Sequence, residues 1–164
     1  MLAGGRAAEA ANGAAPPREE AEVSAQSETE RNKAVIRRFV EEVQNKKDFA
    51  VYDELNDPEF VNLSSPPGVP PDREGGKMYL SGLLNAFPDS EFTIDEMIAE
   101  GERVATKKTF TGTHTADLGD IPATGKRVTL EYVDIMRVRN GRIVEHWLSM
   151  DQLSFLQQLG VMPT

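Results

Sequence analysis

The sequence of 164 residues contains no cysteine and only two histidines, His114 and His146. Without cysteine the chain can form no disulfide, no thiolate nucleophile and no cysteine-ligated zinc site. Two histidines are too few for a histidine-rich metal centre, so we expect the chain to bind no metal ion.

Basic residues are also scarce, because 18 lysines and arginines stand against 27 aspartates and glutamates, a formal charge of −9 at pH 7. A nucleic-acid-binding protein carries a basic stripe, and anionic membranes attract basic segments. The acidic balance argues against nucleic-acid and membrane partners and favours a small, neutral or weakly polar molecule.

Long apolar runs are missing as well. The sequence has no stretch of about 18 apolar residues that could span a membrane. Its N-terminus lacks the basic start and apolar core of a secretory signal, and its glutamates disfavour a mitochondrial transit peptide. We therefore expect a cytoplasmic protein.

The composition changes near residue 27. Residues 1–27 are rich in alanine, glycine, proline and glutamate and have few large apolar side chains. Such a segment buries too little surface to offset its loss of conformational entropy, which predicts a disordered tail. Residues 28–164 are predicted to form one domain, which is large enough to fold without disulfides.

Three helices are predicted in the first half of this domain. The first carries an apolar stripe at helical spacing, formed by Val35, Ile36, Phe39, Val40 and Val43. Ser27 or Thr29 is expected to cap its start. Residues 48–55 are predicted as a second, short helix and residues 75–87 as a third. Between these two helices, four prolines within residues 59–76 predict a stiff irregular loop.

The second half of the domain alternates between apolar and polar residues, which is typical of strands. The predicted strands cover residues 91–99, 102–114, 128–138 and 142–150. Asn140-Gly141 is a strong tight-turn signal between the last two strands. A short helix over residues 152–159 follows, with Asp151 as its expected cap.

Helices followed by antiparallel strands predict the α+β class. We expect a curved antiparallel sheet that wraps around the N-terminal helices. A sheet of this shape can leave a cavity at its open end, where small ligands commonly bind.

Asp134 interrupts an apolar strand face. The even positions from 128 to 138 are otherwise apolar or aromatic, and they include Tyr132 and Met136. If this face lines a pocket, loss of solvent raises the pKa of Asp134 toward the range that suits proton transfer at neutral pH. The alternatives are a structural aspartate bonded to a neighbour and a face exchanged by a β-bulge.

The partner strand places His146 where it could share the pocket and form a proton-transfer pair with Asp134, the alternative being a structural histidine. His114 is placed at the pocket rim or in an exposed loop. Trp147 belongs to the core or an interface, or it forms a ligand platform. Because both faces of this hairpin carry large apolar groups, a second subunit is expected to cover one of them, which predicts a homodimer.

Several segments together resemble the SnoaL-like polyketide cyclase family over residues 30–162. They read FVNLSSPPG, TFTGTHTADLG, PATGKRV, NGRIVEHW and LQQLG. The resemblance implies an NTF2-like fold, a cone of curved sheet and helices that is usually dimeric. It also implies intramolecular aldol ring closure on an aromatic polyketide without metal or organic cofactor. In the family an acidic pocket residue transfers the proton, and a histidine lies nearby.

The resemblance can be carried to individual positions. Aligned on NGRIVEHW, the family's catalytic aspartate falls at Leu148 and its pocket histidine at Asp134. A histidine that many relatives carry after the asparagine of FVN is Leu63 here. Either Asp134 and His146 take over the proton chemistry, or the family's reaction is lost.

We therefore predict Asp134 and His146 as catalytic residues, with Tyr132 as an oxyanion donor if it turns inward. The predicted substrate-binding residues are Tyr132, Leu148, His114, Leu63, Phe110, Met136 and Trp147.

Three functions remain open at this point. The first is cofactor-free ring closure, or a related proton transfer, on a hydrophobic carbonyl compound. The second is non-catalytic binding of a small apolar ligand, which Leu148 and Leu63 favour. The third is an epoxide hydrolase-like reaction, which needs an Asp–Arg–Asp arrangement around a water. Arg137 lies on the opposite strand face from Asp134, which argues against this third function.

Overall fold

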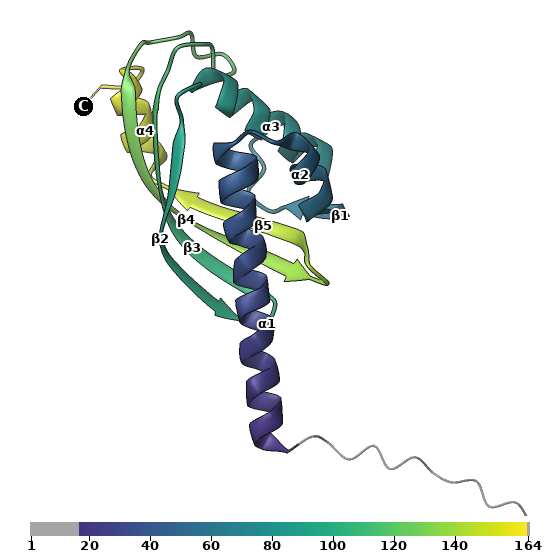
Figure 1. Ribbon diagram of the computed structural model, residues 1–164. Helices are drawn as coiled ribbons and strands as arrows, with labels where there is room; N and C mark the ends of the chain where they lie inside the picture. The colour runs from purple at the N-terminus through teal and green to yellow at the C-terminus, as the bar shows by residue number, and fades with distance from the viewer. Residues whose placement is uncertain (1–16, 164) are drawn as a thin grey trace, which may run out of the picture.

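The computed structural model describes residues 17–163, which form helices packed on one curved five-stranded sheet (Figure 1). The helical elements are α1 (Arg18–Arg38), η1 (Phe39–Asn45), α2 (Phe49–Leu55), α3 (Arg73–Ala86) and α4 (Gln152–Leu159). The strands are β1 (Asn56–Asn62), β2 (Glu91–Glu100), β3 (Arg103–Thr113), β4 (Arg127–Arg139) and β5 (Arg142–Met150). The predicted α+β class is confirmed.

Helix α1 begins earlier than the sequence predicts. Residues 18–27, assigned to the tail, form its first turns and lie exposed beyond the body of the domain (Figure 1). Helix-forming alanine and glutamate, with Glu19 and Glu20 in the first turn, favour this extension. Ser27 and Thr29 are not caps, because their hydroxyls donate to carbonyls one turn earlier. Residues 1–16 of the predicted tail lie outside the described residues.

The predicted second and third helices are confirmed as α2 and α3. The Asp48 carboxylate accepts hydrogen bonds from the first backbone amides of α2, and Asp72 caps α3 in the same way. Between α1 and α2, the chain winds as the π-helix η1, a form often found at functional sites. This segment carries Gln44, which faces the interior of the domain.

The sheet has the order β1-β5-β4-β3-β2, with antiparallel pairing from β5 to β2 as predicted. Asn140 and Gly141 both have positive φ, as the tight turn between β4 and β5 requires. Strand β1 was not predicted, and it pairs parallel to β5, so the sheet is mixed. Pro58 is tolerated within β1 because this strand forms an edge of the sheet.

The concave side of the sheet faces the helices and carries the core. One buried cluster is built around Ile36, Val104 and Met136, and a second around Phe87 and Phe110. The capped helix α4 closes the second cluster, since the Asp151 carboxylate accepts from the Ser154 amide as predicted. Both clusters contribute residues to the wall of one cavity.

Candidate active site

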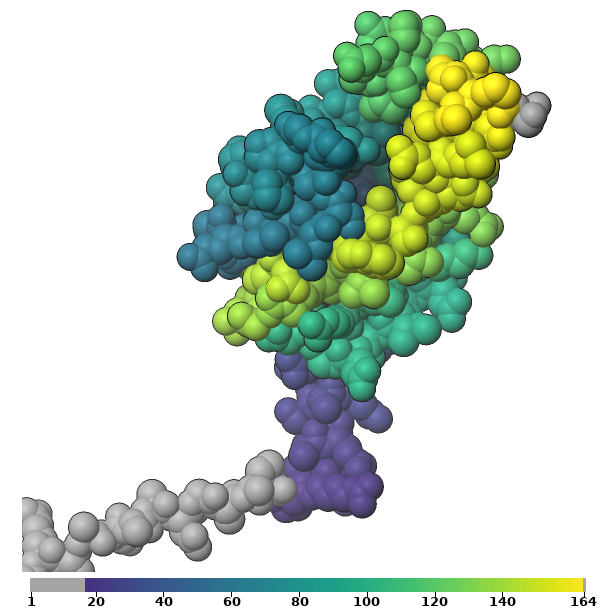
Figure 2. All heavy atoms as spheres, turned by 180° about the vertical axis from the view of Figure 1, so that it is seen from behind, coloured from purple at the N-terminus to yellow at the C-terminus, as the bar shows by residue number. Residues whose placement is uncertain are grey.

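The cavity has a volume of about 630 Å³ and is lined by residues of both the sheet and the helices. Its mouth is visible in Figure 2 as a hollow between the teal α3 region and the yellow C-terminal elements. The volume falls in the range usual for small-molecule sites. Aromatic and aliphatic side chains dominate its walls, among them Phe39, Tyr52, Phe60, Leu80, Leu83, Phe92, Phe110, Leu130, Met136 and Phe155.

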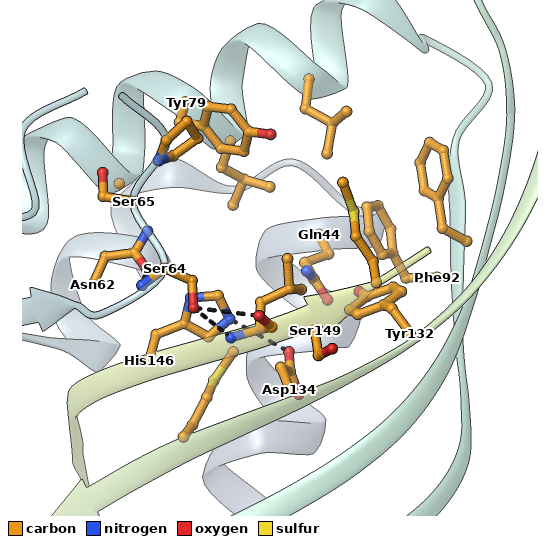
Figure 3. Close-up of a pocket in the computed structure, with 18 of the residues that line it drawn as sticks. Gln44, Asn62, Ser64, Ser65, Tyr79, Phe92, Tyr132, Asp134, His146 and Ser149 are labelled. Carbon is orange, nitrogen blue, oxygen red and sulfur yellow. Dashed lines mark hydrogen bonds and ion pairs between the residues drawn. The ribbon is translucent and has the colours of Figure 1, made fainter. Parts of the chain in front are cut away.

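Asp134 lies on the wall of this cavity and is only 1% exposed (Figure 3). The strand alternation in β4 places it there, because the even positions from 128 to 138 are all buried, as predicted. Its Oδ2 accepts a hydrogen bond from Lys108 Nζ at 2.6 Å and lies 3.7 Å from His146 Nε2. The expected proximity of Asp134 and His146 is therefore observed.

Lys108 was not predicted as part of the site. It lies in β3 with its side chain completely buried, opposite Tyr132 in the β3–β4 ladder. Its neighbours on the same strand face, Thr106 and Phe110, are buried as well. A lysine on an otherwise buried strand face is the sequence signal that could have identified it.

The charge state of Asp134 differs from the expectation. Burial acts to raise the pKa of its carboxyl, but the Lys108 ammonium and His146 outweigh burial and lower the pKa below its ordinary value. Burial likewise opposes the charge of Lys108, yet the acidic groups of Tyr132 and Asp134 outweigh it and raise the lysine pKa. The pair is therefore ionised at neutral pH, and Asp134 is available as a base.

Three residues that line the cavity each carry one polar atom that has no hydrogen-bond partner among residues 17–163. These atoms are Asp134 Oδ1, Tyr132 Oη and Gln44 Oε1, and all three are buried. Burial raises the pKa of Tyr132, so its hydroxyl keeps its proton and can donate. A buried polar group without a partner costs about 1–3 kcal/mol, so this cluster favours a ligand that supplies the missing hydrogen bonds.

Four of the predicted substrate-binding residues line the cavity: Phe110, Tyr132, Met136 and Leu148. Leu148 lies directly opposite Asp134 in the β4–β5 ladder. Paired residues in an antiparallel ladder project from the same face with neighbouring Cβ atoms. The leucine and the carboxylate therefore share one region of the wall.

The other three predicted binding residues do not line the cavity. His114 is buried in the core, where its ring stacks on Phe87 and its Nδ1 lies 3.1 Å from the Thr124 hydroxyl. Its position was wrong because the chain after β3 turns inward and is tied back at Thr124. Leu63 is 61% exposed and Trp147 is 43% exposed, on the opposite side from their inward-facing neighbours.

Polar residues of β1 and the proline loop were missed. Asn62, Ser64 and Ser65 line the cavity (Figure 3). The Ser64 hydroxyl accepts from the Leu148 amide at 2.9 Å and donates to the Leu148 carbonyl at 3.3 Å, which fixes the loop to β5. Asn62 ends the unpredicted parallel strand β1, and Ser64 and Ser65 follow it. The FVNLSSPPG segment was the available signal, but Leu63 was the only residue of this segment predicted to bind.

The outer face of the sheet carries Arg137, which pairs with Glu102 and Glu145 and not with Asp134. Within the part of the chain that the structure describes, Arg137 and Asp134 therefore lie on opposite faces of β4. Within residues 17–163 there is no group of three histidine, aspartate or glutamate side chains suited to a metal ion. None of the described helices is long and apolar enough to cross a membrane.

Comparison with known proteins adds to this geometry. The family model described as SnoaL-like polyketide cyclase matches residues 34–159. No match was found among curated proteins. Of the solved structures, IdmH from Streptomyces antibioticus, a candidate polyketide cyclase, is 33% identical with a TM-score of 0.68, and the match covers 79% of this chain and 99% of IdmH.

Two further structures are similar. TsrD from Streptomyces laurentii is 26% identical with a TM-score of 0.73, over 80% of this chain and 96% of TsrD. AclR from Streptomyces galilaeus, a candidate hydroxylase, is 29% identical with a TM-score of 0.73, over 83% of this chain and 89% of AclR. These findings confirm the resemblance and the NTF2-like α+β fold.

Proposed function

Because the chain belongs to the SnoaL-like polyketide cyclase family, we propose that it closes a ring on a hydrophobic carbonyl compound by an intramolecular aldol reaction, with no cofactor. The proposal rests chiefly on one observation: the carboxylate of Asp134, a residue of the largely apolar cavity lining, has one oxygen without a hydrogen-bond partner among the described residues. The apolar walls would fold a flexible substrate so that its two reacting carbons meet.

Asp134 Oδ1 is the base in this reaction. It takes an acidic proton from the carbon next to a carbonyl, and the electron pair of that bond forms an enolate whose oxygen accepts a hydrogen bond from Tyr132. The enolate carbon then bonds to a second carbonyl carbon, whose oxygen becomes an alkoxide. The proton on Asp134 Oδ1 then passes to this alkoxide, which restores the carboxylate. His146 stands beside the other carboxylate oxygen, with its Nε2 3.7 Å from Oδ2.

The replacement of the family's aspartate by Leu148 is compatible with this role. Leu148 and Asp134 are paired across neighbouring strands on the same face. This chain therefore carries its carboxylate on β4, one strand away from the family's position on β5, and both positions line the cavity. On β4 the carboxylate could serve the same proton transfer.

A non-catalytic binding function is the second candidate, and the Lys108–Asp134 ion pair favours it, because a paired carboxylate is a weaker base. The two candidates differ in proton abstraction. An apolar 1,3-diketone dissolved in D2O with the protein is a suitable probe, and 1H NMR follows the loss of its α-proton signal. We expect exchange that saturates with diketone concentration. Ligand-induced stabilisation of the protein without accelerated exchange would instead support simple binding.

We also propose that the chain forms a homodimer through the outer face of the sheet. Trp147 is paired with Ile135 on this face, and Val133 beside them is exposed. A second copy would remove these apolar side chains from water. Sedimentation equilibrium should give twice the chain mass for the parent protein and a monomer for Trp147→Lys. A monomeric parent protein would contradict the proposal.

A further inference from the structure

Lys108 reaches Asp134 across the sheet from the neighbouring strand β3. In the β3–β4 ladder Lys108 is opposite Tyr132, whereas Asp134 is opposite Thr106, so the ion pair is diagonal. Long side chains span such diagonal positions. The ammonium lies 5.6 Å from the centroid of the Tyr132 ring and 2.6 Å from Asp134 Oδ2. The ammonium therefore bonds to Asp134 and lies over the ring of Tyr132, and both of these β4 residues line the cavity.

The ion pair is an unusual choice for stability alone. Both side chains are almost fully buried, with exposed fractions of 0% for Lys108 and 2% for Asp134. Removing two charges from water is unfavourable, and replacing a buried pair by apolar residues is often neutral or stabilising. Stability alone therefore does not explain why the pair is present.

The two oxygens of the Asp134 carboxylate have different surroundings. Oδ2 is occupied by Lys108 and faces His146, whereas Oδ1 has no partner among the described residues. Asp134 lines the cavity, but Lys108 does not, so the ammonium lies behind the carboxylate and has no contact with the ligand space. Any effect of Lys108 on a ligand must pass through Asp134 or Tyr132.

We infer that Lys108 is a positioning residue, which holds Oδ2 of Asp134 so that the carboxylate remains charged and presents Oδ1 to the ligand. In its absence, a carboxyl group in this apolar cavity would bind a proton and lose its function as a base. The effect on reaction rate rests on the proposed function, but the effect on the charge of Asp134 does not.

The charge of Asp134 can be measured directly without any substrate. The 13C signal of its carboxyl carbon, assigned by its disappearance in Asp134→Asn, is followed against pH in the parent protein and in Lys108→Gln. Loss of the ammonium should raise the apparent pKa by about 1–3 pH units. Thr106→Val is the matched control, because it removes a buried hydroxyl opposite Asp134 without a change of charge. The apparent pKa of Asp134 in this variant should equal that of the parent protein.

An equal apparent pKa in the parent and Lys108→Gln would overturn the inference. If Lys108→Gln does not fold, the parent protein alone tests the inference. At pH 6 the 13C chemical shift of its Asp134 carboxyl carbon should be that of a carboxylate. A chemical shift typical of a protonated carboxyl group would overturn the inference. The exchange assay gives a separate readout, in which Lys108→Gln should lose more rate at pH 6 than at pH 9. Absence of exchange in the parent protein would count against the proposed reaction only.

Discussion

Asp134→Asn is expected to slow α-proton exchange of a bound diketone by about 10²–10⁴-fold, the usual contribution of a positioned general base. Asparagine has nearly the same shape as aspartate and can still accept a hydrogen bond from Lys108, but it cannot take a proton. The measurement is the exchange rate at saturating diketone in D2O. Binding of the diketone should change far less than the rate, because the apolar walls are untouched.

The control for this prediction lies on the same strand. Glu131 is exposed on the outer face of β4, where it pairs with Lys107. Glu131→Gln removes one carboxylate from β4 without any change in the cavity and should exchange protons at the parent rate. A folded Asp134→Asn protein with the parent rate would show that Asp134 is not the base.

Lys108→Met is expected to destabilise the protein by about 3–5 kcal/mol at neutral pH, because it leaves a buried carboxylate without its partner. Urea unfolding followed by the fluorescence of Trp147, the single tryptophan, measures this loss. The double variant Lys108→Met/Asp134→Leu removes both charges and should recover most of the stability. If the double variant is as unstable as Lys108→Met, packing of the lysine stem and not charge explains the loss.

The pH dependence of this loss follows from the direction of each pKa. In the parent protein the Asp134 pKa is lowered, so the stabilisation is present above the unfolded-state value of about 3.9 and is lost as the pH falls through the folded-state value. In Lys108→Met burial alone remains and raises that pKa. The folded variant then binds a proton that the unfolded chain releases, so its deficit should shrink as the pH falls from 7 toward 4. A deficit independent of pH would contradict this explanation.

Much of the fold followed from local patterns. The apolar stripe from Val35 to Val43, the alternation in β2 to β5 and the Asn140-Gly141 turn each correspond to an observed element. Strand β1 could not be predicted in this way, because it is short, contains Pro58 and acquires its pairing only from β5, far along the chain. Parallel pairing of this kind leaves little local signal.

The site could be predicted where strand alternation determines which side chains face the cavity. Asp134, His146, Tyr132 and Leu148 lie on the cavity because their strand positions require it. His114 could not be placed in the same manner, since it follows the end of β3, where alternation no longer applies. The lowered pKa of Asp134 was missed for another reason: its partner Lys108 is distant in sequence, and only the register of β3 against β4 brings the two together.

The central claim is that Asp134 Oδ1 faces the reacting part of a carbonyl ligand. The most direct measurement is a crystal structure with a planar enol of an apolar 1,3-diketone bound in the cavity. We expect the enol hydroxyl within hydrogen-bond distance of Oδ1 and its carbonyl oxygen within reach of the Tyr132 hydroxyl. A well-ordered enol whose oxygens point to the mouth, with only carbon atoms against Asp134, would contradict the account.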